Sequence, residues 1–505
     1  MTPKKTPLAL ASALSGVVFA TAAPPFDLVP AILVGLVGFA WTLDANDART
    51  AARHGFSFGL AANVVALRFV PDVVARFTPL PWIAGVVLLL LLAAAQAIPW
   101  VIAGLVTSAV VRRALLPPFA AFAIGVYVAC FVPAIFPWTP AGGLTPWPWT
   151  VQTAEIIGER GTSFLVAIIA GILVLGVRQT MRTAHVRAGA ASFAIAAAVI
   201  AVMAVQGTLR MRAVERTRAD ATTVRMAAIQ PAFDATDRWD PKRAAMMLER
   251  LTSLTKNAEQ RGALLTVWPE SAYPFTIAHG ARREPAGARA VLQPGVRGPV
   301  LTGAYLSGGA GLGYNAAILV EPDGTLDPSA DKRHLLWFGE TVPLADVFPW
   351  LRRVFSRGTG LVAGKETVVL ATSNIRAAVL NCYEDTLPAA SREAMSVDPN
   401  VLVNVTNDAW FAGSSEGELH LRLSALRAIE TRRDLVRAVN RGPTSFVDAT
   451  GRVRARYDAP LPGPLMVDVA LLETPRTPYA RFGDVPLATL AVAAVGVAAL
   501  RRRRS

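Results

Sequence analysis

Seven long apolar stretches in the first half of this chain limit its fold more than any other feature. Each is close to the length that a helix needs to cross about 30 Å of hydrocarbon. Hydrophobic residues make up 53% of the chain and charged residues only 17%, which is too apolar for an ordinary soluble protein. We therefore predict an α-helical membrane bundle of about eight spans, at 7–23, 28–43, 56–71, 82–109, 117–136, 162–177, 190–206 and, near the end of the chain, 485–500.

The basic residues between these stretches predict one orientation in the membrane, because Lys and Arg are enriched on the cytoplasmic side of membrane helices. Lys4 and Lys5 precede the first span, so we expect the N-terminus in the cytoplasm. Alternation of the spans then places the other basic groups on the same side: Arg49 and Arg53, Arg112 and Arg113, Arg178 with Arg182 and Arg187, and Arg501 to Arg504. The polar segment at about 210–480 is then outside the cytoplasm, provided that 82–109 forms one helix, kinked at Pro99.

The polar segment has the pattern of an α/β domain, with short β-rich runs between amphipathic helical stretches. The expected helices cover about 241–260 and 417–432. The expected strands cover 224–229, 264–268, 300–305, 316–320, 376–381, 401–405, 435–439, 445–448 and 465–469. We expect three parts: transmembrane helices at 1–209, a catalytic domain at 220–472, and a last helix with a basic tail at 485–505. Residues 208–220 are expected to form a short hinge.

Charge and cysteine content exclude several classes of function. The net charge is +14, but the basic residues lie beside apolar runs instead of forming one basic domain, so we expect no nucleic-acid partner. The only two cysteines, Cys130 and Cys382, do not form a disulfide framework. Cys130 lies in an apolar run and is expected to be a packing residue. The histidines lack metal-ligand spacing, so we expect neither a metal nor a cofactor.

Three segments of the α/β domain carry residues suited to catalysis. Glu270 directly follows an apolar strand, where a half-buried carboxylate can serve as a general base. Lys332 is followed eight residues later by Glu340; a lysine ammonium can stabilise an oxyanion, although a surface ion pair has the same pattern. Cys382 follows another apolar strand, where the positive end of a helix would favour its thiolate, although a lone cysteine at a strand end is more often inert.

Together, the three segments resemble the nitrilase superfamily, which has an αββα sandwich and a Glu–Lys–Cys triad. The residues around them are similar to the apolipoprotein N-acyltransferase family, whose plan of seven membrane spans, a catalytic domain and one further span also matches. The matching motifs are Trp268-Pro269-Glu270-Ser271-Ala272, Phe338-Gly339-Glu340-Thr341-Val342-Pro343-Leu344, Cys382-Tyr383-Glu384, Asn407-Asp408-Ala409-Trp410-Phe411, Arg427-Ala428-Ile429-Glu430, 437–440 and Tyr479-Ala480-Arg481-Phe482-Gly483-Asp484.

The resemblance implies a two-step acyl transfer at the outer face of a bacterial inner membrane. Glu270 would take the proton of Cys382, Lys332 would stabilise the oxyanion, and a thioester would form from a phospholipid acyl donor. The acceptor would be the N-terminal amine of a diacylglyceryl apolipoprotein. Supporting roles are then expected for Glu340, Tyr383 and Glu384, and substrate-binding roles for Trp268, Asn315 and Trp410. We expect a monomer.

Two departures from the family pattern leave the identity of the acceptor open. Leu419 replaces a usual Gln before His420, and Arg441 replaces a usual Thr after Asn440. The alternatives are a membrane-tethered nitrilase-like amidase that hydrolyses small amides, a non-enzymatic lipid-binding scaffold, and an acyltransferase with a different amine acceptor. Retention of all three triad residue types argues against a scaffold.

Overall fold

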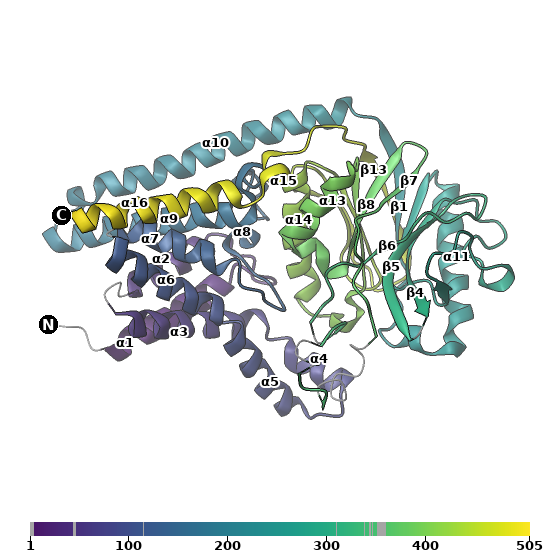
Figure 1. Ribbon diagram of the computed structural model, residues 1–505, viewed down its shortest axis with the longest axis horizontal. Helices are drawn as coiled ribbons and strands as arrows, with labels where there is room; N and C mark the ends of the chain where they lie inside the picture. Colours follow the sequence, from purple (N-terminus) through teal and green to yellow (C-terminus); the bar gives the residue numbers. More distant parts are fainter. Residues whose placement is uncertain are drawn as a thin grey trace. The chain divides into compact units, whose positions relative to one another are not determined.

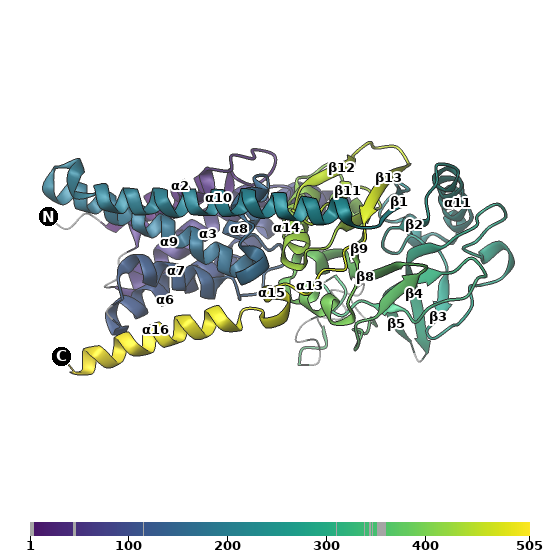
Figure 2. The ribbon, with the colours of Figure 1, turned by 90° about the horizontal axis from the view of Figure 1, so that it is seen from above.

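A computed structural model describes residues 5–43, 47–114, 116–309, 311–337, 339–342, 345, 347–350 and 360–504 (Figures 1 and 2). The motif residues Phe338, Pro343 and Leu344 lie outside this part of the chain. The protein divides into two compact units. The helical unit comprises Met1–Met211 and Phe482–Ser505, and the α/β unit comprises Arg212–Arg481.

The helical unit packs its helices closely through small residues. A Cβ atom on Gly16 would lie 2.2 Å from the carbonyl oxygen of Phe58, and one on Gly55 would lie 2.2 Å from that of Trp100. Such contacts let helix backbones approach each other, as is typical of membrane bundles. The described helices of this unit are α1 (Lys5–Ala20), α2 (Ala31–Thr42), α3 (Ala48–Ala66), α4 (Val70–Phe77), α5 (Trp82–Ala95), α6 (Ile98–Ala114), α7 (Pro118–Ala129), α8 (Pro140–Gly143), α9 (Ala154–Thr183), most of α10 (Ala190–Asp220) and α16 (Val485–Arg504).

The helix lengths support fewer clear membrane spans than the eight expected. Within the described residues, three helical stretches are long and apolar enough to cross a membrane, namely Trp82–Arg113, Ala154–Thr183 and Val186–Asp220. A fourth is obtained if α3 and α4, which bend by 55°, count as one span. The other apolar helices are shorter: Leu8–Ala20, Ala31–Thr42, Pro118–Ala129 and Val485–Arg501.

Two helix boundaries differ from the expected ones for clear local reasons. The third helix begins at Ala48, well before the apolar run, because the side chain of Asp47 accepts a hydrogen bond from the Arg49 N–H and caps the helix. The long stretch from Trp82 to Arg113 breaks between α5 and α6, just before Pro99, where the expected kink lies.

The hinge expected at 208–220 is wrong, because α10 remains helical to Asp220. Its last turns are held by ion pairs within the α/β unit. Arg218 binds both carboxylate oxygens of the buried Asp434 at 2.8 Å, and Glu215 pairs with Arg454 at 3.1 Å. These charges explain why an Arg-rich segment is ordered as helix.

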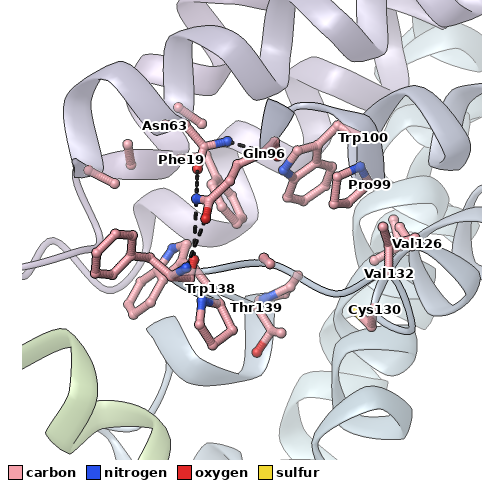
Figure 3. A pocket seen from close by; sticks show the side chains of 18 residues that line it. Phe19, Asn63, Gln96, Pro99, Trp100, Val126, Cys130, Val132, Trp138 and Thr139 are labelled. Atoms are coloured by element: carbon pink, nitrogen blue, oxygen red, sulfur yellow. Dashed lines mark hydrogen bonds between the residues drawn. The ribbon is translucent and has the colours of Figure 1, made fainter. Parts of the chain in front are cut away.

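A cavity of about 80 Å³ lies inside the helical unit (Figure 3). Its lining is mostly apolar, with Phe19 and Trp100 on one side and Trp138 in the loop after α7. The Gln96 side chain accepts a hydrogen bond from the Phe136 N–H at 2.8 Å and donates one to Asn63 at 3.1 Å. Gln96 therefore ties the loop after α7 to α3 and to the α5–α6 break.

The α/β unit contains two sheets that face each other, with helices on their outer faces (Figure 1). One sheet has the order β13-β1-β2-β4-β5-β6, with β3 paired to β4, and the other has the order β12-β11-β10-β9-β8-β7. The strands are β1 (Thr223–Gln230), β2 (Leu265–Trp268), β3 (Thr276–Ala278), β4 (Val300–Gly309), β5 (Leu312–Val320), β6 (Ala330–Asp331), β7 (Val369–Thr372), β8 (Ile375–Asn381), β9 (Val401–Thr406), β10 (Leu435–Val439), β11 (Thr444–Val447), β12 (Val453–Tyr457) and β13 (Gly463–Ala470).

Three apolar layers hold this unit together. Side chains of both sheets, such as Val267 and Val403, form the core between the sheets. Helix α11 (Ala244–Gln260) covers the outer face of the first sheet. Helices α13 (Pro388–Ala394) and α14 (Glu416–Thr431) cover the outer face of the second. The expected αββα sandwich is therefore confirmed, and each of the nine expected strands overlaps an observed one.

Candidate active site

Glu270 is placed by the end of β2. Only Pro269 separates it from the strand end at Trp268, and Ser271 turns the chain with a φ of 51°. Left-handed φ values are uncommon for residues other than glycine and concentrate at functional sites. The neighbouring strand β4 allows this turn because it has glycine at position 303, where a Cβ atom would lie 2.6 Å from the Glu270 Cα.

The close approach at Gly303 yields a prediction. We expect Gly303→Ala to displace the Glu270 backbone and to lower the free energy of unfolding by about 1–3 kcal/mol, because the atoms that the new methyl group meets belong to the main chain. Chemical denaturation checks the stability. Gly313→Ala on β5 is the matched control, because its Cβ would meet nothing closer than 3.7 Å. Equal stability of the two variants would contradict this account of the turn.

Lys332 joins two carboxylates in the interior of the site. It follows β6, and its side chain is only 2% exposed. Its Nζ lies 2.8 Å from an oxygen of Glu340 and 3.3 Å from an oxygen of Glu270. Asn315 on β5 completes the arrangement, because its Nδ2 donates to Glu270 at 2.7 Å and to Glu340 at 2.8 Å. The surface ion pair considered for Lys332 is therefore wrong.

The charges of this cluster compensate one another. Burial alone would lower the pKa of Lys332, but Glu340 and Glu270 together raise it well above its ordinary value. Burial favours the neutral form of Glu340, yet Lys332 and the N–H of Leu336 hold the pKa of this carboxyl below its ordinary value. Lys332 is thus a fixed cation. It has three N–H donors, and the two carboxylates use two of them.

Cys382 lies at the sharp turn where β8 ends. It begins a short 3₁₀ turn, Cys382–Thr386, and has a φ of 51°. Asn381 and Glu384 form a capping box that fixes this turn. The thiol is within electrostatic reach of both Glu270 and Lys332. The structure therefore brings the three predicted triad residues together.

The electrostatic state of Cys382 differs from the expected one. A helix end was expected to favour the thiolate, but the element that follows is a single short turn. Burial, reinforced by the charge of Glu270, raises the pKa of the Cys382 thiol well above its ordinary value, and Lys332 only partly opposes this. The resting group is therefore a neutral thiol, which needs a base in order to react.

The two residues after the cysteine have different surroundings. The Glu384 carboxylate is buried and accepts hydrogen bonds from the N–H groups of Arg333, His334 and Asn381, at 2.8 to 2.9 Å. It therefore ties the loop of Lys332 to the turn of Cys382. Tyr383 is partly exposed, and burial of its hydroxyl raises its pKa.

The two tryptophans predicted to bind substrate differ in their surroundings. Trp268 is fully buried in the layer that faces α11, and its indole N–H donates to Thr255 at 2.9 Å. Its packing is that of a core residue. Trp410 is partly exposed in a 3₁₀ turn, Asp408–Phe411, after β9. Their substrate-binding roles stay predictions.

A second buried polar cluster, which the sequence analysis missed, lies between α14 and the turn that begins at Cys382. His420 on α14 contacts Asp385, which also binds Arg437 on β10. Asp408, Glu416 and His420 each offer one atom within 4.8 Å of the others, which is a spacing that could hold a metal ion. His420, however, faces a carboxylate at each ring nitrogen, Asp385 and Asp408, which favours the imidazolium over a metal ligand.

The geometry suits nucleophilic acyl transfer. A partly buried thiol, a carboxylate that can accept its proton and a lysine ammonium, which uses two of its three N–H donors on carboxylates among the described residues, occupy one site. The thiol can form a covalent acyl intermediate, and the ammonium can stabilise the oxyanion that precedes it.

Comparisons with known proteins agree with both units. A family profile described as Apolipoprotein N-acyltransferase N-terminal domain matches residues 15–172, and one described as Carbon-nitrogen hydrolase matches residues 225–478. A protein of Geobacter metallireducens named apolipoprotein N-acyltransferase is 32% identical, over 98% of this chain and 95% of its own length. One of the same name from Bradyrhizobium diazoefficiens is 30% identical, with the same two coverages. A solved amidase structure from Nesterenkonia, of the nitrilase superfamily, aligns with a TM-score of 0.39 and 18% identity, over 53% of this chain and 96% of that chain.

Proposed function

Because this chain belongs to the apolipoprotein N-acyltransferase family, we propose that it moves an acyl chain from a phospholipid to the N-terminal amine of a diacylglyceryl apolipoprotein. The observation that carries the proposal is the convergence of Glu270, Lys332 and Cys382 in one site. The Lys332 Nζ lies 3.3 Å from Glu270 Oε1, and both charges act on the Cys382 thiol.

In the first step Glu270 accepts the thiol proton while the sulfur of Cys382 attacks the ester carbonyl carbon of the phospholipid. The third N–H donor of Lys332 stabilises the oxyanion. The carbon–oxygen bond to the glycerol then breaks. The lysophospholipid leaves as an alcohol, with the proton from Glu270, and a thioester remains on Cys382.

In the second step the free amine of the acceptor attacks the thioester carbonyl. Glu270 takes a proton from the amine, the carbon–sulfur bond breaks, and the sulfur regains a proton. The product is an amide, and the enzyme returns to its resting state. Covalent catalysis divides one difficult reaction into two easier ones.

The membrane arrangement is part of the proposal. We assign eight spans to 1–209 and 485–505 in the inner membrane of a bacterium, with the catalytic domain, 220–472, on the periplasmic side. The exposed apolar faces of the helices support membrane contact, since Leu91, Val202 and Leu490 are each more than half exposed. The chain acts as a monomer, Trp410 forms part of the substrate pocket, and Tyr383 supports the site.

The direct test is product analysis with the full-length protein in vesicles of one phospholipid of defined acyl chains. The proposal predicts that a diacylglyceryl-cysteine peptide gains one acyl chain on its amine and that lysophospholipid appears in equal amount. The alternative amidase would instead release ammonia from small amides and leave the peptide unchanged.

A further inference from the structure

The carbonyl group of Cys382 is held from two other elements of the fold. It accepts a hydrogen bond from Asn404 Nδ2 on β9 at 2.9 Å and contacts His420 Nε2 on α14 at 3.3 Å. These contacts fix the main chain of Cys382, whose φ of 51° is unfavourable for any residue other than glycine. Loss of either contact would let the turn relax toward a more common conformation.

The imidazole of His420 is itself fixed by charged groups. Its Nε2 also lies 2.5 Å from Asp385 Oδ1, and its Nδ1 lies 3.4 Å from Asp408 Oδ1. A carbonyl and a carboxylate only accept hydrogen bonds, so Nε2 must carry a proton. Asp385 in turn accepts from Arg437 Nε at 3.0 Å, and Asp385 and Arg437 are both 0% exposed.

We propose that His420 is a positioning residue, which holds the Cys382 main chain so that its thiol meets Glu270 and Lys332, with Asp385 and Arg437 fixing the imidazole. The proposal rests on the proposed function in one respect, that Cys382 is the nucleophile. The polar chain runs from β10 through the turn after Cys382 to α14, and it ends on the Cys382 carbonyl.

The protonation of His420 agrees with this geometry. Burial lowers its pKa, but Asp385 and Asp408 raise it to about 10, against the charge of Arg437. The titratable groups that face His420 are therefore Asp385, Asp408 and Arg437, together with Glu416 on its own helix. With these groups in place the imidazolium persists throughout the neutral range.

The first test measures the rate of acyl-enzyme formation from phospholipid in three full-length variants. We expect His420→Ala to lower the rate by about 10- to 100-fold at an unchanged half-saturating lipid concentration, because a small misplacement of the thiol is enough for such a loss. His420→Gln keeps an N–H donor near the position of Nε2, so its rate of acyl-enzyme formation should be about tenfold higher than that of His420→Ala. His279→Ala, which removes the more exposed His279–Asp331 pair, is the control.

The second test is alkylation of Cys382 by iodoacetamide, in a Cys130→Ser background, and it does not depend on the acyl transfer. His420→Ala should slow this reaction at least about fivefold at neutral pH, because the thiol loses its alignment with Glu270. If wild type forms no acyl-enzyme, the proposed function fails, and alkylation alone decides the role of His420.

Asp385→Asn covers the case in which His420→Ala does not fold. The loss of the Asp385 carboxylate removes the group that fixes both His420 and Arg437, so alkylation should slow relative to wild type at neutral pH. Rates for His420→Ala within about threefold of wild type would overturn the proposal. So would equal losses in the Ala and Gln variants with equally lowered unfolding temperatures, since that result indicates a structural role alone.

Discussion

Replacing Cys382 by serine is expected to abolish acyl transfer, with a loss of at least about 10⁴-fold. The hydroxyl preserves the shape of the turn, but it is a far weaker acid than a thiol. The thiol already has a raised pKa through burial, so Glu270 has to remove its proton during the attack. The same carboxylate cannot do so for an alcohol at a useful rate.

The measurement is transfer of a labelled acyl chain to a diacylglyceryl-cysteine peptide by each purified variant. Cys130→Ser is a matched control, because Cys130 is the other cysteine and lies in the helical unit. It should retain wild-type activity. Transfer by the Cys382→Ser variant at more than about 1% of the wild-type rate would remove Cys382 from the mechanism.

Replacing Lys332 by methionine should have the second largest effect, on both activity and stability. Methionine fills a similar volume but leaves Glu270 and Glu340 together without their cation. Loss of one partner from a buried ion pair typically costs about 3–5 kcal/mol. Loss of the oxyanion donor should lower acyl-enzyme formation by about 10²- to 10³-fold.

The pH dependence of this stability difference follows from Glu340. Lys332 holds the pKa of that carboxyl below 4.5, so the pair stabilises the folded state above this pH and loses its effect as the pH falls through the lowered pKa. Denaturant unfolding of both proteins should therefore differ most at neutral pH and least in acid. Lys242→Met, at an exposed lysine, is the control. A difference that grows on acidification would contradict the ion-pair account.

The positions of the strands along the chain were predictable from sequence because they depend on local pattern, whereas the triad was assigned through the resemblance to the nitrilase superfamily. Glu270 and Cys382 follow apolar strands, and strand ends of two facing sheets can meet. By contrast, β12 was missed although Val453, Ala455 and Tyr457 alternate with two arginines as in a half-exposed strand, and the structure pairs it with β11. The end of α10 was predicted as a hinge because its arginines find their carboxylates only in the folded α/β unit.

The site contains roles that no local pattern reveals. Asn315 was expected as a wall of the substrate pocket, yet it bridges the carboxylates of Glu270 and Glu340. His420 and Asp385 are 35 residues apart in sequence and meet only through the packing of α14 against the turn of Cys382. Asp408, His420 and Arg437 lie in or beside motifs that the sequence analysis names, but no local pattern indicates that Asp385 contacts His420 and Arg437.

The central claim is the covalent acyl intermediate on Cys382. Intact-mass analysis of the full-length protein after incubation with a phospholipid of defined acyl chains tests it most directly. The account predicts a mass gain of one acyl chain on wild type and none on Cys382→Ser, with the adduct removed by hydroxylamine and by a diacylglyceryl-cysteine peptide. An unmodified wild-type mass while small amides are hydrolysed, or an adduct that persists on Cys382→Ser, would contradict it.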